Sequence, residues 1–412
     1  MHRPTTLLVL SALSLGSLAA IASQAAQAQT YNVLYNFLGG SAGHDPYAGL
    51  TMDKLGNLYG TDGVGGTGDG IAFRLNHTNS GWIFTTIYKF GSDFLAQDGA
   101  GPLARVIIGP DGRLYGTTAS GGEYGGFNGG GCGVVFDLTP PAPTSPFPSG
   151  SWPETVAHKF TNMYDGCSPG NGNLVFDHGY MYGTTENGGL GCQEEEARGC
   201  GTVYAMTRGN ENVRYRFAGG EDGADPRSGV VLDSPGNLLY GTTRYGGGAG
   251  YGVVYKLTLD GTEFILHRFS GGSDGAVPAG GVILDASSNL YGTTSIGGSG
   301  GGGTVFTLTL SGTFTVIYSF LGDNGPEDSL AMDAGGNLYG TTYHDGSSGH
   351  GMVFKLAPRS NGSWLFTDLH DFTGSDGAYP LGGVILDRNG NLYGTTSSGG
   401  TDGAGVVFEI TP

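Results

Sequence analysis

Basic residues are scarce in this chain. Its 412 residues include 18 Lys and Arg against 36 Asp and Glu, so the formal net charge is −18, and charged residues make up only 13%. Such a chain is a poor counter-ion for phosphate groups, and we expect neither nucleic acid nor an anionic membrane surface as a partner. The P-loop, G-x-S-x-G, H-E-x-x-H and dinucleotide fingerprints are also absent, so we expect no cofactor and no resident metal.

Long apolar runs are missing after the first residues. A short basic start precedes an apolar run from Leu7 to Ile21, and Ala26-Gln27-Ala28 supplies a cleavage site of the A-x-A type. This arrangement predicts a signal peptide over residues 1–28. An uncleaved anchor helix is the alternative, but the run is short and contains Ser and Gly. We therefore expect a secreted or periplasmic protein without a membrane span after cleavage.

Glycine, in contrast, is abundant. It accounts for 83 of the 412 residues, about three times its usual share of ~7%. Proline is ordinary at 18, which argues against collagen and against Pro/Gly-rich disorder. The glycines belong to an internal repeat, because the pentapeptide Leu-Tyr-Gly-Thr-Thr or a near copy occurs seven times. Its tyrosines are Tyr59, Tyr115, Tyr182, Tyr240, Tyr291, Tyr339 and Tyr393.

Each repeat contains four strand-sized apolar runs separated by Gly, Asp, Asn and Ser turns. In the fifth unit, the runs that we label a to d are Gly281–Asp285, Asn289–Thr294, Gly303–Leu308 and Phe314–Phe320. Adjacent large residues in run b, such as Leu-Tyr, must point to opposite faces of one strand, which indicates burial on both sides. Seven such units predict an all-β fold, a seven-bladed β-propeller with four antiparallel strands per blade. A parallel β-helix is the alternative, but its coils are usually shorter.

The two ends of the repeat region complement each other. Tyr31–Phe37 matches run d and Gly405–Ile410 matches run c, so the N-terminal strand is expected to close the last blade. Closure of this kind avoids an open sheet edge. We therefore expect one propeller domain over residues 29–412, and a monomer.

The repeat motif resembles that of a known family. Gly-Asn-Leu-Tyr-Gly-Thr-Thr followed by Gly-Gly, as in Gly390–Gly400, and Gly-Val-Val-Phe, as in Gly405–Phe408, is similar to the Gloeo/Verruco (GloVer) tandem-repeat family of exported bacterial proteins. The resemblance covers nearly all of the mature chain. It implies export and a repeat architecture, and it brings no assigned reaction.

Most recurring carboxylates are expected to maintain the repeat. One set ends strand a and a second set precedes a glycine before the proline, and capping of turn amides is the natural role of both. Calcium binding in each blade is the alternative, although an isolated Asp-Gly is far from a calcium loop. The two sets are Asp53, Asp177, Asp233, Asp285, Asp333 and Asp387, and Asp98, Asp165, Asp222, Asp274 and Asp376.

Only four cysteines are present, and in an exported protein they indicate two disulfides among three possible pairings. Cys192 and Cys200 flank one acidic loop and are expected to pair. Cys132 ends a b–c loop close to the d–a loop that bears Cys167, which favours the second bridge. A zinc site is the weaker alternative, because no C-x-x-C occurs.

A functional site is expected where the repeats differ, because residues that recur in every unit mostly maintain the unit. The d–a and b–c loops share one face of a propeller, and the positions after the proline of each d–a loop lie at the mouth of the central channel. Most of these residues are small, and the larger or polar ones suggest a pocket for an uncharged or acidic saccharide. A solvated rim of mutually neutralised charges is the alternative. The candidate ligand-binding residues are Tyr47, Arg105, Asn171, Arg227, Glu327, Asp328 and His344.

His344 comes from a loop of the sixth unit that departs from the repeat. Together with Asp345 and His350, it could ligate a metal or supply a general base. The spacing matches no metal signature, however, and loop histidines are usually solvated.

These features favour an exported, non-catalytic binding or scaffold module for a polysaccharide or a surface protein. The alternative is a carbohydrate-active hydrolase or lyase at the channel mouth. That enzyme would use Glu327, Asp328 or His344, with two arginines to neutralise charge.

Overall fold

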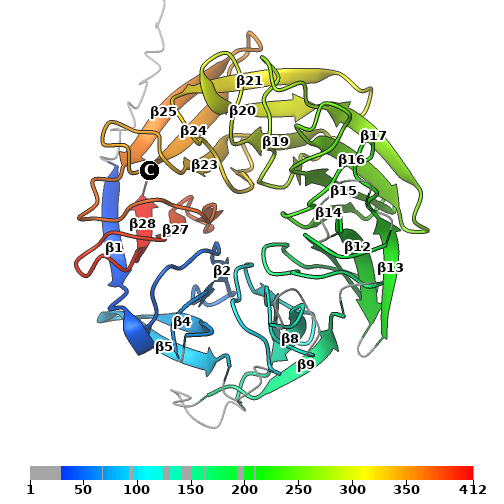
Figure 1. Ribbon diagram of the computed structural model, residues 1–412. Coiled ribbons are helices and arrows are strands. Elements are labelled where there is room, and N and C mark those ends of the chain that lie inside the picture. Colours follow the sequence, from blue (N-terminus) through cyan, green and yellow to red (C-terminus); the bar gives the residue numbers. More distant parts are fainter. Residues whose placement is uncertain are drawn as a thin grey trace, which may run out of the picture.

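The computed structural model describes residues 29–411 except 67, 92–96, 124–129, 142–150, 162–163, 191, 193–198 and 208–209. The signal peptide predicted over residues 1–28 lies outside the described residues. Within them, the strands form seven four-stranded antiparallel sheets, and the single helical segment is the 3-10 turn η1 (Gly40–Ala42). The sheets stand around a central axis as a seven-bladed β-propeller, as the repeat predicts (Figure 1).

The blades are numbered in chain order from the sheet β2–β5, and in each blade strand a lies nearest the axis and strand d at the rim (Figure 1). The a strands are β2 (Thr51–Met52), β6 (Ile107–Ile108), β10 (Val175–Asp177), β14 (Val230–Asp233), β18 (Ile283–Leu284), β22 (Ala331–Met332) and β26 (Ile385–Leu386). The b strands are β3 (Leu58–Asp62), β7 (Leu114–Thr117), β11 (Tyr180–Thr185), β15 (Leu238–Thr243), β19 (Leu290–Thr294), β23 (Leu338–Thr342) and β27 (Leu392–Thr396).

The two outer strands of each blade are at least as long as the inner two. The c strands are β4 (Ile71–Thr78), β8 (Val134–Leu138), β12 (Thr202–Thr207), β16 (Val253–Thr258), β20 (Gly301–Leu308), β24 (Met352–Pro358) and β28 (Val406–Thr411). The d strands are β5 (Gly81–Lys89), β9 (Glu154–Lys159), β13 (Asn210–Arg216), β17 (Glu263–Arg268), β21 (Phe314–Leu321), β25 (Trp364–Asp371) and, for blade seven, β1 (Thr30–Asn36).

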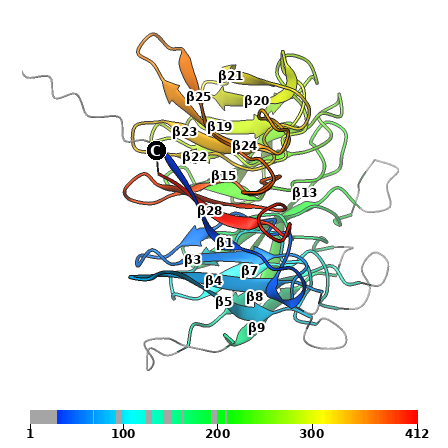
Figure 2. The ribbon, with the colours of Figure 1, turned by 90° about the vertical axis from the view of Figure 1, so that its left-hand side faces the viewer.

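The N-terminal strand closes the ring. β1 pairs antiparallel with β28 from Thr30 opposite Thr411 to Asn36 opposite Val406, and the two strands lie side by side in Figures 1 and 2. Strand β1 therefore supplies the outer edge of the blade that the C-terminal strands begin. The closure expected from the sequence is present.

The core lies between neighbouring blades, which explains the Leu-Tyr pair of the repeat. Leu290 belongs to a buried cluster with Tyr240 of blade four, whereas the adjacent Tyr291 packs against a cluster that includes Leu330 of blade six. Each b strand therefore contributes one large side chain to each of its two inter-blade layers. Strand b is buried on both faces, as predicted.

The glycine of the pentapeptide is required by the ring opposite it. Gly60 pairs with Phe73 across strands β3 and β4, and a Cβ on this glycine would lie 2.5 Å from the Phe73 Cζ atom. The same opposition of glycine and aromatic ring recurs in the other six blades. A larger residue would displace a fully buried ring, so glycine is a packing requirement here.

The recurring aspartates form turns. Asp53 Oδ1 accepts hydrogen bonds from the backbone amides of Leu55 (2.8 Å) and Asn57 (2.9 Å), and its Oδ2 accepts from Asn57 Nδ2 (2.8 Å). Blades five, six and seven repeat this turn. In the d–a loops, Asp165 and Asp376 likewise accept from backbone amides and hydroxyl groups. Both oxygens of such a carboxylate are used within the repeat.

Two disulfides link loops on one face. Cys132 pairs with Cys167, joining the b–c loop of blade two to the segment that enters blade three, and Cys192 pairs with Cys200 within blade three. These are the pairings expected from the sequence. In the part of the chain that the structure describes, no helix is long and apolar enough to cross a membrane.

Candidate functional site

The channel mouth is built on backbone in the left-handed region. A residue with positive φ precedes the proline in six of the d–a loops, and in blade six the corresponding Asn324 stands two positions before it. This conformation lets the backbone of one residue form hydrogen bonds to the b–c loops of two neighbouring blades. Asp225, for example, donates its N–H to the Cys200 carbonyl and accepts from the Arg244 N–H, both at 3.0 Å. The residues are Asp45, Gly101, Ser168, Asp225, Val277 and Tyr379.

Threonines of the pentapeptide fix the mouth to the preceding blade. The Thr293 hydroxyl of blade five donates to the Asp328 carbonyl of blade six at 3.1 Å. Equivalent hydrogen bonds reach backbone carbonyls at the mouth in blades one, two, five and seven. Thr117 and Thr184 make no such bond within the described residues, and the backbone bridge of Asn173 with Gly229 joins blades three and four instead. The contacts that hold the rim to the neighbouring blade therefore differ where Asn171 and Arg227 stand.

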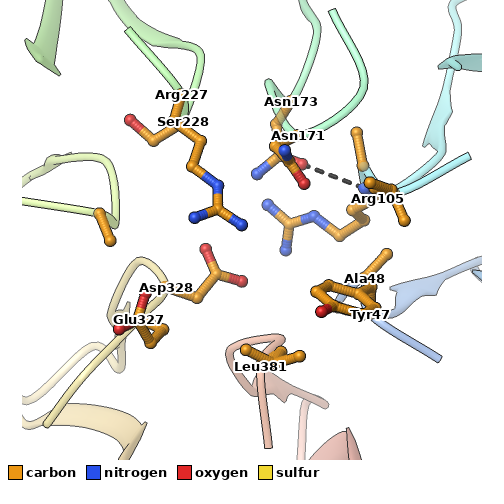
Figure 3. Close-up of a pocket in the computed structure, with 14 residues that line it drawn as sticks. Tyr47, Ala48, Arg105, Asn171, Asn173, Arg227, Ser228, Glu327, Asp328 and Leu381 are labelled. Atoms are coloured by element: carbon orange, nitrogen blue, oxygen red, sulfur yellow. Dashed lines mark hydrogen bonds between the residues drawn. The ribbon is translucent and has the colours of Figure 1, made fainter. Parts of the chain in front are cut away.

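A polar pocket opens on the axis at this mouth (Figure 3). Its free volume is about 50 Å³. That is room for a few water molecules or a carboxylate group, well below the ~300–1,000 Å³ of sites that enclose a small ligand. The structure brings six of the seven predicted residues together here, namely Tyr47, Arg105, Asn171, Arg227, Glu327 and Asp328.

Two arginines enter the pocket from different blades. Arg105 comes from blade two and Arg227 from blade four, and both guanidinium groups point toward the axis (Figure 3). Arg227 Nε lies 3.8 Å from Glu186 Oε1. Arg105 donates its backbone N–H to Asn173 Oδ1 at 3.2 Å, while no described residue forms a hydrogen bond or ion pair with its guanidinium. The pocket thus presents cationic donors to an incoming group.

The two neighbouring acids differ. Asp328 accepts backbone N–H bonds from Ser329 on one oxygen and Gly383 on the other, both at 2.6 Å, so its carboxylate is held in place. Burial raises the pKa of Glu327, and the nearby Asp328 charge adds to this, although Arg227, Arg244 and His344 oppose it. Glu327 therefore keeps its proton to higher pH than an exposed glutamate does.

Sequence reasoning missed three residues around the pocket. Asn173 lines it, and Glu186 accepts a hydrogen bond from Asn171 and faces Arg227. Arg244 lies within electrostatic reach of Glu327. A signal for the last two was present, because the position after the pentapeptide is small in most other blades, as at Ala119.

Below the mouth, the channel becomes less polar. Arg105, Asn173, Ser228 and Asp328 line both the pocket and a deeper axial cavity of about 220 Å³, whose other lining residues lie in or just before the a strands and are mainly apolar, such as Val230. These four side chains form a polar neck between the mouth and a chamber whose other side chains are mainly apolar. A charged ligand group is therefore favoured at the mouth and disfavoured beneath it.

His344 does not line the pocket. Its ring packs against Tyr343 and Tyr379, with centroid distances of 4.4 and 5.2 Å. Asp345 is buried, which raises the pKa of its carboxyl to about 6, and His350 packs near Tyr379 at 5.6 Å. Over the described ranges, no group of three or more His, Cys, Asp or Glu side chains is placed to hold a metal ion.

A known family model matches most of the sequence. The model described as the Gloeobacter/Verrucomicrobia repeat matches residues 18–238 and 190–408. The chain belongs to this family. Its members share the repeat that forms the blades, which confirms the resemblance drawn from the motif. Among curated proteins, none matches this chain.

The fold resembles that of solved structures at low sequence identity. The soluble aldose sugar dehydrogenase of Escherichia coli in its apo form has a TM-score of 0.50 and 14% identity, covering 93% of this chain and 99% of its own. A putative 6-phosphogluconolactonase from Bacteroides uniformis has a TM-score of 0.49 and 14% identity, covering 79% and 84%. At this identity the likeness to the dehydrogenase shows the fold alone.

Proposed function

We propose that this protein is an exported, non-catalytic binding module, and that its axial pocket takes the carboxylate of an acidic saccharide. One observation carries the proposal: Arg105 and Arg227, from blades two and four, direct their guanidinium groups into the same small pocket. Planar guanidinium forks pair with carboxylates in a bidentate manner. The chain has only 18 basic residues, and a binding role explains why two of them meet on the axis.

The acids support binding more than catalysis. Both oxygens of Asp328 accept backbone amides, so this carboxylate is poorly placed to exchange a proton with a substrate. Glycoside hydrolysis needs a pair of carboxyl groups acting together. Together with Asn171 and Glu327, Asp328 instead offers fixed partners for sugar hydroxyl groups.

The catalytic alternative rests on Glu327. Its raised pKa is what a general acid at neutral pH requires, and Arg227 could neutralise a substrate carboxylate in a lyase reaction. A test of function must therefore score cleavage as well as retention.

Export is part of the same proposal. The N-terminal segment reads as a signal peptide. The two disulfides support it, because such bonds form and persist mainly in oxidising compartments.

The test is a polysaccharide screen with the mature protein. Immobilised polysaccharides with and without uronic acid residues are assayed for retention, and the supernatants for new reducing or unsaturated ends. We expect retention on uronate-containing polymers without cleavage, weakened by Arg105→Ala and by Arg227→Ala. Arg388→Ala, which removes the same charge from the opposite face, is the matched control.

Two results would overturn the proposal. Cleavage that Glu327→Gln abolishes would make the protein an enzyme. Retention by no saccharide, together with capture of a surface protein that survives both arginine substitutions, would move the binding site away from the pocket.

A further inference from the structure

Four aromatic rings gather beside the axial pocket. Tyr379 lies at their centre, with ring centroids of Tyr343 and His344 at 5.2 Å and of His350 at 5.6 Å. The rings come from the b–c loop of blade six and the d–a loop that enters blade seven. All four side chains are partly exposed. The cluster therefore forms part of the same face as the pocket.

Packing of the repeat does not require these rings. Tyr379 has φ of 57°, at the left-handed position where blades one, two and four place Asp45, Gly101 and Asp225, which suit it, and blade five places Val277. A bulky residue is uncommon there, and such residues concentrate at functional sites. Tyr343 stands at the position after the pentapeptide, where Ser295 and Ser397 suffice in blades five and seven.

The cluster is continuous with the arginine pocket. The Tyr343 backbone N–H donates to the Gly325 carbonyl at 3.0 Å, two residues before Glu327. Leu381, two residues after Tyr379, lines the pocket together with Glu327. The pocket itself is too small for a sugar ring. The ring of a saccharide whose carboxylate enters it must lie outside, over this face.

We propose that Tyr47, Tyr343 and Tyr379 form a stacking subsite for the pyranose rings of the saccharide whose carboxylate binds Arg105 and Arg227. The subsite rests on the function proposed above. A pyranose ring has an apolar C–H face that suits an aromatic face, and its equatorial hydroxyl groups can reach the carboxylates of Glu327 and Asp45. The chain of sugars then runs from the axis toward blades six and seven.

The test compares ligands of different length by titration calorimetry. The probes are galacturonic acid and its linear dimer, trimer and tetramer, applied to the mature protein. We expect the affinity to rise at least tenfold from monomer to trimer. In Tyr379→Asn and Tyr343→Ala the trimer should bind no more than about twofold more tightly than the monomer does. Tyr180→Ala, at a partly exposed tyrosine of the opposite face, is the control.

Tyr379→Asn separates binding from folding. Asparagine tolerates the left-handed backbone that tyrosine occupies here. We therefore expect this variant to melt at the same temperature as the wild type or higher while it loses the length dependence. A lower melting temperature with unchanged length dependence would assign the ring a structural role and overturn the subsite.

The remaining outcomes separate the two proposals. If the monomer binds through the arginines and longer probes bind no better, the subsite is wrong and the pocket stands. If neither monomer nor oligomer binds while other acidic saccharides also fail, the pocket is wrong and the subsite falls with it.

Discussion

The outer joints, which are the contacts between the d strands of neighbouring blades, are of two kinds. Where blades five, six, seven and one meet the preceding blade, a ring near the start of strand d stacks on a Tyr or His of that blade. The centroid distances are 3.8, 4.4, 3.7 and 4.0 Å, respectively. The stacked pairs are Phe314 with His267, Phe366 with Tyr318, Tyr31 with His370 and Phe84 with Tyr35.

In blades two, three and four, the same position holds a glutamate. Burial raises the pKa of Glu154, Glu211 and Glu263 to about 7 in each case. Asp98, Asp165 and Asp222 of the preceding d–a turns add to this effect. Glu263 also accepts a hydrogen bond from the Tyr215 hydroxyl at 3.1 Å. These joints replace ring stacking with a partly buried acid.

The acidic half of the ring, blades two to four, also holds several departures from the repeat. Arg105, Asn171 and Arg227 stand in blades two to four, and both disulfides lie there. Covalent links thus occur in the blades that ring stacking does not hold. The comparison teaches that ring stacking joins the outer strands of the aromatic half, whereas both disulfides lie in the acidic half.

The largest effect is expected from removing β1. Deleting residues 31–37 takes away two stacked pairs, through Tyr31 and Tyr35, and the fully buried Phe37. At about 1.5–3 kcal/mol for each large apolar side chain, the free energy of unfolding should fall by at least ~5 kcal/mol. Urea denaturation measures this, with a chain lacking only residues 29–30 as control. Equal stability of the two chains would show that the ring needs no closure.

Removal of the Cys132–Cys167 disulfide should have the next largest effect. The bond closes a segment with a sequence separation of 35, and chain entropy predicts a loss of about 3–4 kcal/mol in the Cys132→Ala/Cys167→Ala variant. The Cys192–Cys200 bond, with a separation of 8, should contribute about 1 kcal/mol less. Denaturant midpoints of both variants decide the order. The reverse order would mean that the longer bond does not hold the acidic half.

Exchange of the two kinds of joint tests the comparison itself. Phe366→Glu converts a stacked joint into an acidic one and should cost about 2–3 kcal/mol. Glu211→Phe places a ring against His158 in the manner of Phe314 against His267, and should raise the free energy of unfolding by about 1 kcal/mol. Thermal unfolding at pH 7.5 measures both. Destabilisation by Glu211→Phe would show that the glutamate is the better partner in its own joint.

An effect that is small for each residue concerns pH. Between about pH 4.5 and 7, the three glutamates lose their protons in the unfolded chain but keep them in the fold. The folded state then binds more protons, so the free energy of unfolding falls as pH rises. Replacing all three with Gln should remove this fall, on the order of 1 kcal/mol per residue because solvent screens partly exposed groups.

The two proteins must be compared at each pH, because other groups titrate in the same range. Burial raises the pKa of Asp62 to about 6 and lowers that of His267. These contributions are common to both proteins and cancel in the difference. Parallel stability curves from pH 4.5 to 8 would contradict the assignment.

The sequence predicts the fold because the same pattern of four strands and turns recurs seven times. Leu290, Tyr291 and their equivalents require strands buried on both faces, and the N- and C-terminal runs complete one blade. Disulfide pairing followed from the same topology. The strand-a lengths were overestimated, since β18 spans only Ile283–Leu284 where Gly281–Asp285 was expected. The small residues at the mouth form loops anchored by the preceding blade instead of strand.

The site could be predicted only in part. Departures from the repeat identified Arg105, Arg227 and Asp328, because a side chain that breaks a seven-fold pattern is visible without coordinates. The convergence of Glu186 with Asn171 was not visible, since the two come from different loops of one blade. The Tyr379 ring cluster was missed for a related reason. It depends on a left-handed backbone that brings two loops together.

The most direct test of the account is a calorimetric titration of the double variant Arg105→Ala/Arg227→Ala with the galacturonic acid trimer. Each lost charged hydrogen-bonding partner should cost about 1.5–3 kcal/mol, so we expect the affinity to fall at least 100-fold. Arg388→Ala should bind as the wild type does. Trimer binding of equal strength in the double variant and the wild type would contradict the arginine pocket as the binding site.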